Sequence, residues 1–394
     1  MGRIGIYGGT FNPPHLGHIQ AARMAVKTLN LDKLLMIPDH IAPHKALPEN
    51  SPTPWQRLEM LRLAVEQDPA IVVSDVELQR EGPSYTCETV EQLHWQYPQD
   101  QLILLMGTDM FLSFDTWKEP ERIVRNAELA VAYRGDRGEQ QAVQQRQAAL
   151  QEQGVAVHLL ENPVLEISST QLRRLLAFQC ADSFLCPQVA AYIRENGLYD
   201  TRANWKNLPM EQLEQVVIGL LKPSRVAHVL GCRDTAVELA RRWGADEVDA
   251  ARAGILHDIT KALDGPLQLT LCSCYGKILS DFSQKYPKTL HALTGSLVAQ
   301  RIFGENPAVV DAIAWHTTGK ADMNLLETIV YVADYMEPNR NFPGVERLRQ
   351  AAFQDIQGAL KMGLEMTMEH LHRQGNEVSP ESQQALNWLR QIKC

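Results

Sequence analysis

The sequence contains few cysteines, and they are scattered. Seven occur among 394 residues: Cys87, Cys180, Cys186, Cys232, Cys272, Cys274 and Cys394. Their number is odd, and none of them has the paired spacing of a zinc ribbon, so a disulfide framework and a cysteine-rich zinc domain are both excluded. We expect most of these residues to be reduced thiols.

Long hydrophobic runs are also absent. Uninterrupted apolar stretches such as residues 34–37 are far shorter than the roughly 18 residues that a membrane-spanning helix needs. Before the first predicted strand there is no charged and apolar pattern typical of a signal peptide, since Arg3 is the only early charge. We therefore expect a cytoplasmic protein with no membrane partner.

The chain has no excess of positive charge. Its 38 Lys and Arg residues face 47 Asp and Glu residues, which gives a net charge of −9. Because nucleic-acid backbones favour basic surfaces, general nucleic-acid binding is excluded, whereas a small anionic ligand needs only a local positive potential. The hydrophobic content of 45% and charged content of 22% are typical of a soluble globular protein, and the length indicates two domains.

Residues 8–18 (GGTFNPPHLGH) are the most informative stretch of the sequence. They follow an apolar run and precede a helix-like pattern. Gly8 and Gly9 allow the backbone to approach a phosphate closely, and a helix start presents free N–H groups to an anion. His15 and His18, three residues apart, share one side of a helical turn. The stretch therefore predicts a nucleotide site.

Two different patterns divide the chain near residue 203. Before it, β-type runs alternate with helical stretches, which predicts a parallel sheet covered by helices, with the ligand beyond the carboxyl ends of the strands. The expected strands are residues 33–38, 71–76, 102–106, 129–134 and 155–159, and residues 139–153 are expected to form an exposed helix. Beyond residue 203 only helical periodicity remains, at residues 210–221, 224–243, 248–263, 290–303, 307–316, 325–335 and 345–374. We therefore expect domains at residues 1–203 and 204–394.

Further segments suit a nucleotide site in the first domain. Ser169 and Thr170 lie at a predicted helix start, either as N-cap residues or as phosphate ligands, and Arg173 follows one turn later. The segments 43–45 and 83–86 are loops that could contact a second substrate, and Asp109 follows a predicted strand. Trp117 could stack on an aromatic ring or belong to the core.

Together, residues 8–18, 43–45, 83–86, 107–109, 117 and 167–173 resemble the bacterial nicotinate-mononucleotide adenylyltransferases of the His-x-Gly-His nucleotidyltransferase superfamily. The resemblance spans residues 1–199. It implies a Rossmann-like α/β fold and Mg²⁺-dependent transfer of AMP from ATP to nicotinate mononucleotide. Asn12 stands where the family more often has Asp, a change that we expect to matter little. Pantetheine-phosphate or glycerol-phosphate nucleotidyl transfer is a rival within the superfamily.

The resemblance also implies roles for particular residues. The ATP site would comprise Gly8, Gly9, Thr10, Phe11, His15, His18, Asp109, Ser169, Thr170 and Arg173, of which His15, His18 and Arg173 would be catalytic. Nicotinate mononucleotide would be held by His44, Lys45, Thr86, Trp117 and Arg134.

The helical half contains residue types that bind divalent metals. They are His228, the adjacent pair His257 and Asp258, His291, His316 and Asp334. His257 and Asp258 lie on an otherwise apolar predicted helix, where an unpaired carboxylate would cost several kcal/mol to bury. A mixed nitrogen and oxygen site suits iron or manganese.

Residues 225–228, 257–261, 291, 315–319 and 331–340 resemble the all-α HD-domain phosphohydrolases, in particular those that hydrolyse diadenosine tetraphosphate to two ADP. The resemblance implies that His228, His257, Asp258 and Asp334 bind metal, with Fe²⁺ or Mn²⁺ as the expected ion, and that His291 and His316 complete a second metal position or hold phosphate. Lys261, Thr317 and Arg340 would face the phosphates, with Lys261 catalytic. A non-catalytic, nucleotide-binding regulatory domain is the alternative, and the chain could form a homodimer.

Overall fold

The structure is a computed structural model, and it describes residues 2–44, 46–133, 137–161 and 167–391. The chain divides into two compact units, Met1–Ala203 and Asn204–Cys394. Within the described residues, no helix is both long enough and apolar enough to cross a lipid bilayer.

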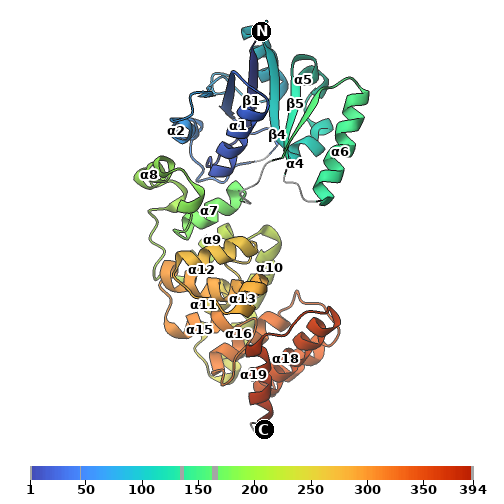
Figure 1. The fold of residues 1–394 in the computed structure, drawn as a ribbon. Helices are drawn as coiled ribbons and strands as arrows, with labels where there is room; N and C mark the ends of the chain where they lie inside the picture. The colour runs from blue at the N-terminus through green and yellow to red at the C-terminus, as the bar shows by residue number, and fades with distance from the viewer. Residues whose placement is uncertain (1, 45, 134–136, 162–166, 392–394) are drawn as a thin grey trace. The chain divides into compact units, whose positions relative to one another are not determined.

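A parallel sheet flanked by helices forms the first unit (Figure 1). Among the described residues it has six strands in the order β3-β2-β1-β4-β5-β6, and every neighbouring pair is parallel. The strands are β1 (Arg3–Gly9), β2 (Lys33–Pro38), β3 (Ile71–Val73), β4 (Gln101–Gly107), β5 (Glu128–Tyr133) and β6 (Val157–Glu161). The helices are α1 (Leu16–Thr28), α2 (Pro54–Val65), α3 (Thr86–Gln96), α4 (Thr108–Leu112), α5 (Pro120–Asn126), α6 (Arg137–Glu152), α7 (Ser169–Ala177) and α8 (Pro187–Glu195).

The strand order places a topological switch point between β1 and β4. From β1 the chain builds outward to β2 and β3, and then returns to add β4 on the other side of β1. The central strands are buried over successive residues, as in β4 from Leu102 to Met106, because helices cover both faces of such a sheet. Ligands of open α/β sheets bind beyond the carboxyl ends of the strands at the switch point. The predicted α/β fold is confirmed.

Some predicted boundaries of the first unit are wrong. The strand expected at residues 71–76 ends at Val73, because Asp75 starts a turn in which its carbonyl accepts from Leu78 N at 2.8 Å. The last strand runs from Val157 to Glu161, in register with β5. Helix α6 is not simply exposed, since Val143 and Leu150 are buried in the core.

The second unit is helical throughout its described residues, as predicted. Its helices are α9 (Met210–Leu220), α10 (Pro223–Trp243), α11 (Glu247–Leu256), α12 (Gly265–Cys274), α13 (Asp281–Lys285), α14 (Leu290–Val298), α15 (Pro307–Trp315), α16 (Leu325–Met336), α17 (Val345–Ala352), α18 (Ile356–Arg373) and α19 (Pro380–Gln391). Helix α10 packs against α11 and α16, and α11 also contacts α15. These four helices surround the centre of the unit.

Two long predicted helices of this unit are interrupted. The helix expected at residues 248–263 ends at Leu256, and the next residues form tight turns, with Lys261 N donating to Asp258 O at 2.9 Å. The helix expected at residues 345–374 is broken before Asp355, whose carboxylate caps α18 by accepting from Gly358 N at 2.9 Å. Helices α12, α13 and α19 were not predicted.

Candidate functional sites

A cavity of about 540 Å³ opens at the carboxyl ends of β1, β2 and β4. Residues 8–11, which include the last two residues of β1 and the two that follow, line it together with Gly107 at the end of β4. A Cβ built on Gly8 or Gly107 would meet no atom within 4 Å, so the backbone at both positions faces open space. This is the surface that a phosphate or a sugar can approach closely.

His15 and His18 meet at the start of α1. His15 is the N-cap residue of the helix, its N–H donates to His18 Nδ1 at 3.2 Å, and the two ring centroids are 3.6 Å apart. The ring of His18 lines the cavity, whereas His15 is buried beside it. Burial lowers the pKa of His15 to about 4, so its imidazole is neutral at neutral pH in the free protein. The two rings form one unit that offers polar atoms to an anion.

The start of α7 is joined to the loop that follows β1. Arg173 Nη1 donates to Asn12 O at 2.8 Å, and Arg173 Nη2 lies 3.1 Å from the hydroxyl of Thr170. The N-cap of α7 is Ser168, whose hydroxyl accepts from Gln171 N at 3.2 Å. The interpretation of Ser169 and Thr170 as N-cap residues is therefore wrong, and both belong to the first turn of α7. None of Ser169, Thr170 and Arg173 lines the cavity itself.

Asn12 has a structural role that sequence reasoning missed. Its side chain is buried, its Oδ1 accepts from Tyr199 Oη at 2.7 Å, and its Nδ2 donates to Ser51 Oγ at 3.0 Å. The main-chain oxygen of the same residue accepts from Arg173. Asn12 thus fixes the loop between Gly9 and His15 from two sides.

Three of the residues assigned to the second substrate, His44, Thr86 and Trp117, line the cavity. Lys45 and Arg134 lie outside the described residues. Asp109 is exposed in the first turn of α4 and does not line the cavity. The lining also includes Ser84 and Tyr85 of the predicted loop 83–86, and Glu77 and Lys118, which the sequence analysis did not select.

Arg57 supports the loop after β1 and was also missed. Its side chain is fully buried on α2 and donates to Asp39 Oδ1 at 2.8 Å and to Thr10 O at 2.6 Å. Asp39 Oδ2 in turn accepts from the hydroxyl of Thr10 at 2.8 Å. The pair links α2, the end of β2 and the loop after β1.

Arg57→Met is expected to destabilise the first unit by about 3–5 kcal/mol, because it leaves the Asp39 carboxylate buried without its partner. Urea unfolding followed by circular dichroism measures the change. Arg62→Met on the same helix is the control, since the Arg62 side chain is 55% exposed and should change the stability little. Equal stability of the two variants would contradict the role of Arg57.

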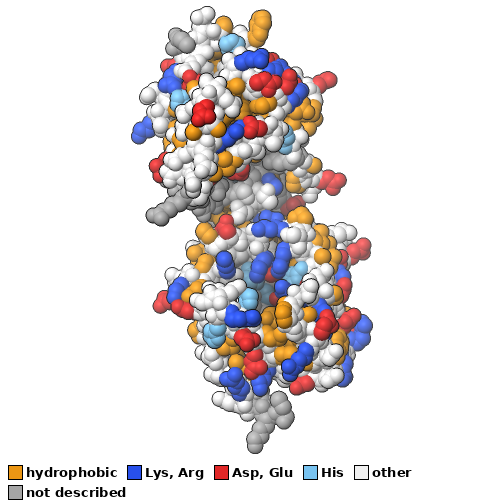
Figure 2. All heavy atoms as spheres, turned by 90° about the vertical axis from the view of Figure 1, so that its right-hand side faces the viewer, with side chains coloured by type: hydrophobic (Ala, Val, Ile, Leu, Met, Phe, Trp, Pro, Cys, Tyr) orange, Lys and Arg blue, Asp and Glu red, His pale blue; other side chains and the backbone are white. Residues whose placement is uncertain are grey.

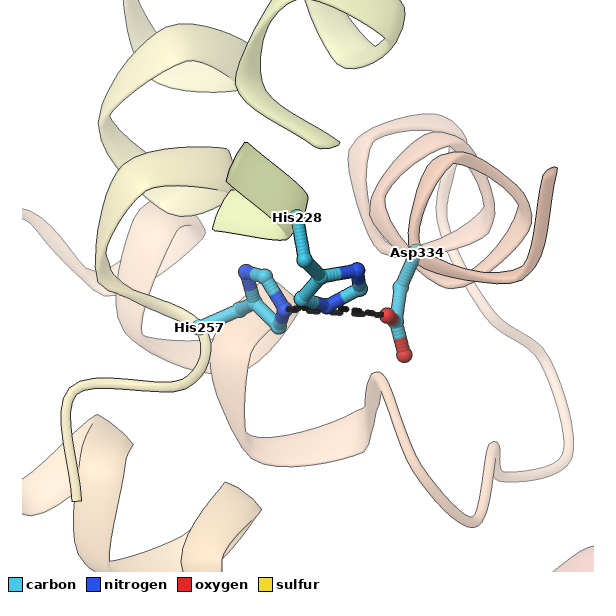
Figure 3. Close-up of side chains that lie close together, drawn as sticks. All are labelled: His228, His257 and Asp334. Carbon is cyan, nitrogen blue, oxygen red and sulfur yellow. Dashed lines mark hydrogen bonds and ion pairs between the residues drawn. The ribbon is translucent and has the colours of Figure 1, made fainter. Parts of the chain in front are cut away.

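The second candidate site lies among α10, α11, α14, α15 and α16. His228 is on α10, His257 ends α11, His316 ends α15 and Asp334 is on α16. His228 Nε2 lies 3.2 Å from His257 Nε2 and 3.1 Å from Asp334 Oδ1 (Figure 3). Residues from distant parts of the chain therefore direct nitrogen and oxygen atoms toward one point.

Asp258 lies at the centre of this cluster. Its Oδ2 is 3.6 Å from both His228 Nε2 and His257 Nε2. Its Oδ1 is 3.5 Å from His291 Nε2 and 3.9 Å from His316 Nε2. All six residues selected from the sequence thus come together. Two groups of them, which share His257, have ligand atoms close enough to hold a metal ion: His228, His257 and Asp334, and His257, Asp258 and His316.

Backbone carbonyls orient the buried imidazoles. His257 Nδ1 is 2.7 Å from Gly254 O, and His316 Nδ1 is 2.7 Å from Ile313 O, so each Nδ1 carries the proton and each Nε2 presents a lone pair to the centre. Burial lowers the pKa of His257 well below its usual range and that of His316 to about 4. His316 Nε2 is buried, and none of the described residues is its hydrogen-bond partner. Neutral rings with inward lone pairs fit a metal ion.

Gly254 brings two of these helices together. A Cβ at this position would lie 2.7 Å from the Cα of Arg233 on α10, so a side chain there would force α10 and α11 apart. The close approach lets His257 reach His228. This glycine carries no visible motif and was not selected from the sequence.

Cationic side chains surround the cluster. Arg225 forms an ion pair with Asp258, and Arg340 Nη2 donates to Asp334 Oδ1 at 2.6 Å. Lys261 Nζ lies 2.9 Å from His291 Nε2, and burial lowers its pKa to about 8. Figure 2 shows histidine side chains in a hollow of the second unit, with lysine and arginine side chains gathered around it. Such a surface suits a polyanion. Thr317, selected from the sequence, also reaches the cluster, at 3.1 Å from His291 Nε2.

Comparisons with known proteins match different parts of the chain separately. Residues 6–175 match the cytidylyltransferase-like family, and residues 225–339 match the HD domain. The chain is 38% identical over 202 residues to a probable nicotinate-nucleotide adenylyltransferase of Neisseria meningitidis serogroup C, covering 51% of this chain and all of the relative. A protein of the same description from Borrelia garinii is 35% identical over 203 residues, covering 51% of this chain and 97% of the relative.

A solved structure covers the other half. The crystal structure of a predicted HD superfamily hydrolase involved in NAD metabolism, from Clostridium acetobutylicum, is 35% identical, with a TM-score of 0.46. It covers 47% of this chain and 99% of that one.

Proposed function

We propose that the chain, which belongs to the nicotinate-nucleotide adenylyltransferase family through its first half and carries an HD domain in its second, transfers AMP from ATP to nicotinate mononucleotide. The products are deamido-NAD and pyrophosphate. The observation that carries this proposal is the junction of the two predicted anion-binding segments, made by the hydrogen bond from Arg173 to Asn12 O beside the paired rings of His15 and His18.

The transfer needs no general base, because the attacking group is already an anionic phosphate. Catalysis then consists of alignment and charge stabilisation. Gly8, Gly9, Thr10 and Phe11 would receive the triphosphate, with polar atoms donated by His15, His18, Ser169, Thr170 and Arg173, and with Asp109 near the ribose or the metal-bound water. Asp39 lines the cavity, but its carboxylate already forms an ion pair with Arg57 and is not available as a metal ligand. Mg²⁺ therefore fits this site as an ion that is bound mainly by the ATP phosphates and enters with them.

The same cavity would hold nicotinate mononucleotide. His44, Thr86 and Trp117 line the cavity, and we assign these residues, with Lys45 and Arg134, to this substrate. The indole ring of Trp117 packs 5.5 Å from the ring of Phe114, centroid to centroid, which holds it in place as a stacking surface.

Turnover of three acceptors tests this assignment. With ATP and Mg²⁺, the chain should adenylylate nicotinate mononucleotide much faster than phosphopantetheine. With CTP and Mg²⁺, it should not transfer CMP to glycerol phosphate. Preferred turnover of phosphopantetheine or glycerol phosphate would replace the proposal with its rival.

We propose further that the HD domain hydrolyses diadenosine tetraphosphate symmetrically to two ADP. His228, His257, Asp258 and Asp334 would hold one or two divalent ions, Fe²⁺ or Mn²⁺, with His291 and His316 at the second position or on phosphate. A bound ion of this kind polarises a phosphate and activates water. Lys261, Thr317 and Arg340 would bind the bridging phosphates, and Lys261 would stabilise charge on the leaving group.

The products distinguish the possible activities of the HD domain. The full chain with Mn²⁺ or Fe²⁺ should convert one diadenosine tetraphosphate and one water into two ADP, and removal of the metal with a chelator should stop the reaction. ATP and AMP as products would show asymmetric cleavage. Binding without cleavage, together with a changed rate of AMP transfer, would support the regulatory alternative. A homodimer and a cytoplasmic location complete the proposal.

A further inference from the structure

We propose that Glu337 is a positioning residue that fixes the proton of His228 and thereby prepares this imidazole to bind metal. Glu337 follows the end of α16 and is 1% exposed. Its Oε1 lies 3.0 Å from His228 Nδ1. The inference rests on the proposed metal site and assigns a role to a residue outside the ligand set.

The other oxygen of Glu337 is also fully engaged. Oε2 accepts from Asn339 N at 2.7 Å and from Asn339 Nδ2 at 2.8 Å. Because two N–H groups donate to Oε2, the carboxylate has a fixed orientation and turns Oε1 toward His228 as an acceptor. His228 Nδ1 then carries the proton that it donates.

The consequence falls on the far side of the ring. With the proton on Nδ1, His228 Nε2 presents a lone pair toward His257 Nε2 at 3.2 Å and Asp334 Oδ1 at 3.1 Å. His257 and His316 are oriented by neutral backbone carbonyls, whereas His228 is oriented by a carboxylate. A carboxylate that accepts from the outer ring nitrogen strengthens an imidazole as a metal ligand, so His228 should bind metal more strongly than His257 or His316.

The fold leaves room for this carboxylate at one position of α10. A Cβ on Gly231 would lie 2.4 Å from Glu337 Oε2 and 3.1 Å from Asn339 Nδ2. Gly231 is three residues after His228 on the same helix, so it faces the same side. Because Gly231 has no side chain, the carboxylate of Glu337 can occupy the space beside α10 at this position.

Glu337→Gln in the full chain tests the proposal. The variant has nearly the same shape but no charge. A Gln side chain has only one oxygen, so it can accept from either Asn339 or His228, and its N–H₂ group then faces the other. We expect Mn²⁺ to bind about 10- to 100-fold more weakly, as measured by electron paramagnetic resonance titration of the metal-free protein. Glu346→Gln is the matched control, because the Glu346 side chain is 75% exposed, and it should leave the Mn²⁺ affinity unchanged.

A spectroscopic measurement separates positioning from general structural support. In the Co²⁺-loaded protein, the His228 Nδ1 proton should give a shifted, solvent-exchangeable NMR signal that His228→Ala removes. Glu337→Gln should shift this signal or broaden it by exchange. Glu337→Asp, which keeps the charge on a shorter side chain, should recover part of the Mn²⁺ affinity.

Gly231→Ala provides a second variant in which Glu337 itself is retained. The added methyl group must displace the carboxylate, so Mn²⁺ should bind more weakly here too, and this test stands if Glu337→Gln fails to fold. Unchanged Mn²⁺ affinity in both variants, with an unchanged Co²⁺ spectrum, would overturn the role of Glu337. If the unaltered chain binds no Mn²⁺, the proposed metal site is wrong.

Discussion

His15→Ala and His18→Ala are each expected to lower kcat for AMP transfer by about 10²–10³-fold, with a smaller change in the KM for ATP. Removing one preorganised donor to developing charge typically has an effect of this size. The measurement is steady-state formation of deamido-NAD from ATP and nicotinate mononucleotide. His94→Ala is the matched control, because His94 is exposed on α3 and does not line the cavity.

The double variant adds a sharper expectation. The ring centroids of His15 and His18 are 3.6 Å apart, and the main-chain N–H of His15 donates to Nδ1 of the His18 ring, so the two residues should act as one unit. Loss of both should therefore lower kcat little more than loss of either one. Single variants as active as the unaltered chain would remove the basis for a triphosphate site at the start of α1.

Asp258→Asn is expected to lower hydrolysis of diadenosine tetraphosphate by at least about 10²–10³-fold and to weaken Mn²⁺ binding, while AMP transfer stays unchanged. The reason is the position of Asp258, whose two oxygens lie within 3.9 Å of four histidine nitrogens. The amide of Asn would turn its N–H₂ group toward two of these histidine nitrogens. It would also lack the negative charge that balances the positive charge of the metal ion. Release of ADP and Mn²⁺ titration measure the two effects.

The control for this variant is Asp311→Asn, which changes an exposed aspartate of the same unit. It should leave the hydrolysis rate and the Mn²⁺ affinity unchanged. Full hydrolysis by Asp258→Asn would show that the cluster around Asp258 is not where the phosphate bond is broken.

The sequence was most informative where short motifs act through the backbone. Glycines after an apolar strand and histidines at a helix start predicted the loop after β1, and the switch from strand to helical periodicity predicted the two fold classes. The polar residues of the helical half also came together as expected, since a buried histidine or aspartate on an apolar helix needs a partner.

What escaped prediction depends on contacts between distant segments. Arg57 reaches Thr10 across 47 positions, and Glu337 reaches His228 across 109. Arg57 has no local signal, and Glu337, although it lies in the segment 331–340, was given no role, because a charged residue on a helix or after one usually faces water. Gly254 was also missed, because the need for a glycine at this position comes from the close approach of α10, which the local sequence does not reveal.

Two helices of the second unit, α11 and α15, end directly before a buried histidine. His257 and His316 each occupy the position where a helix stops, and each ring bonds back to a carbonyl three residues earlier. One extra residue in α11 or α15 would rotate the terminal ring by about 100° around the helix axis and turn its lone pair away from Asp258. The direction of the final imidazole therefore depends on the number of residues in each of these helices. It depends less on which residues lie on the outer side of the helix.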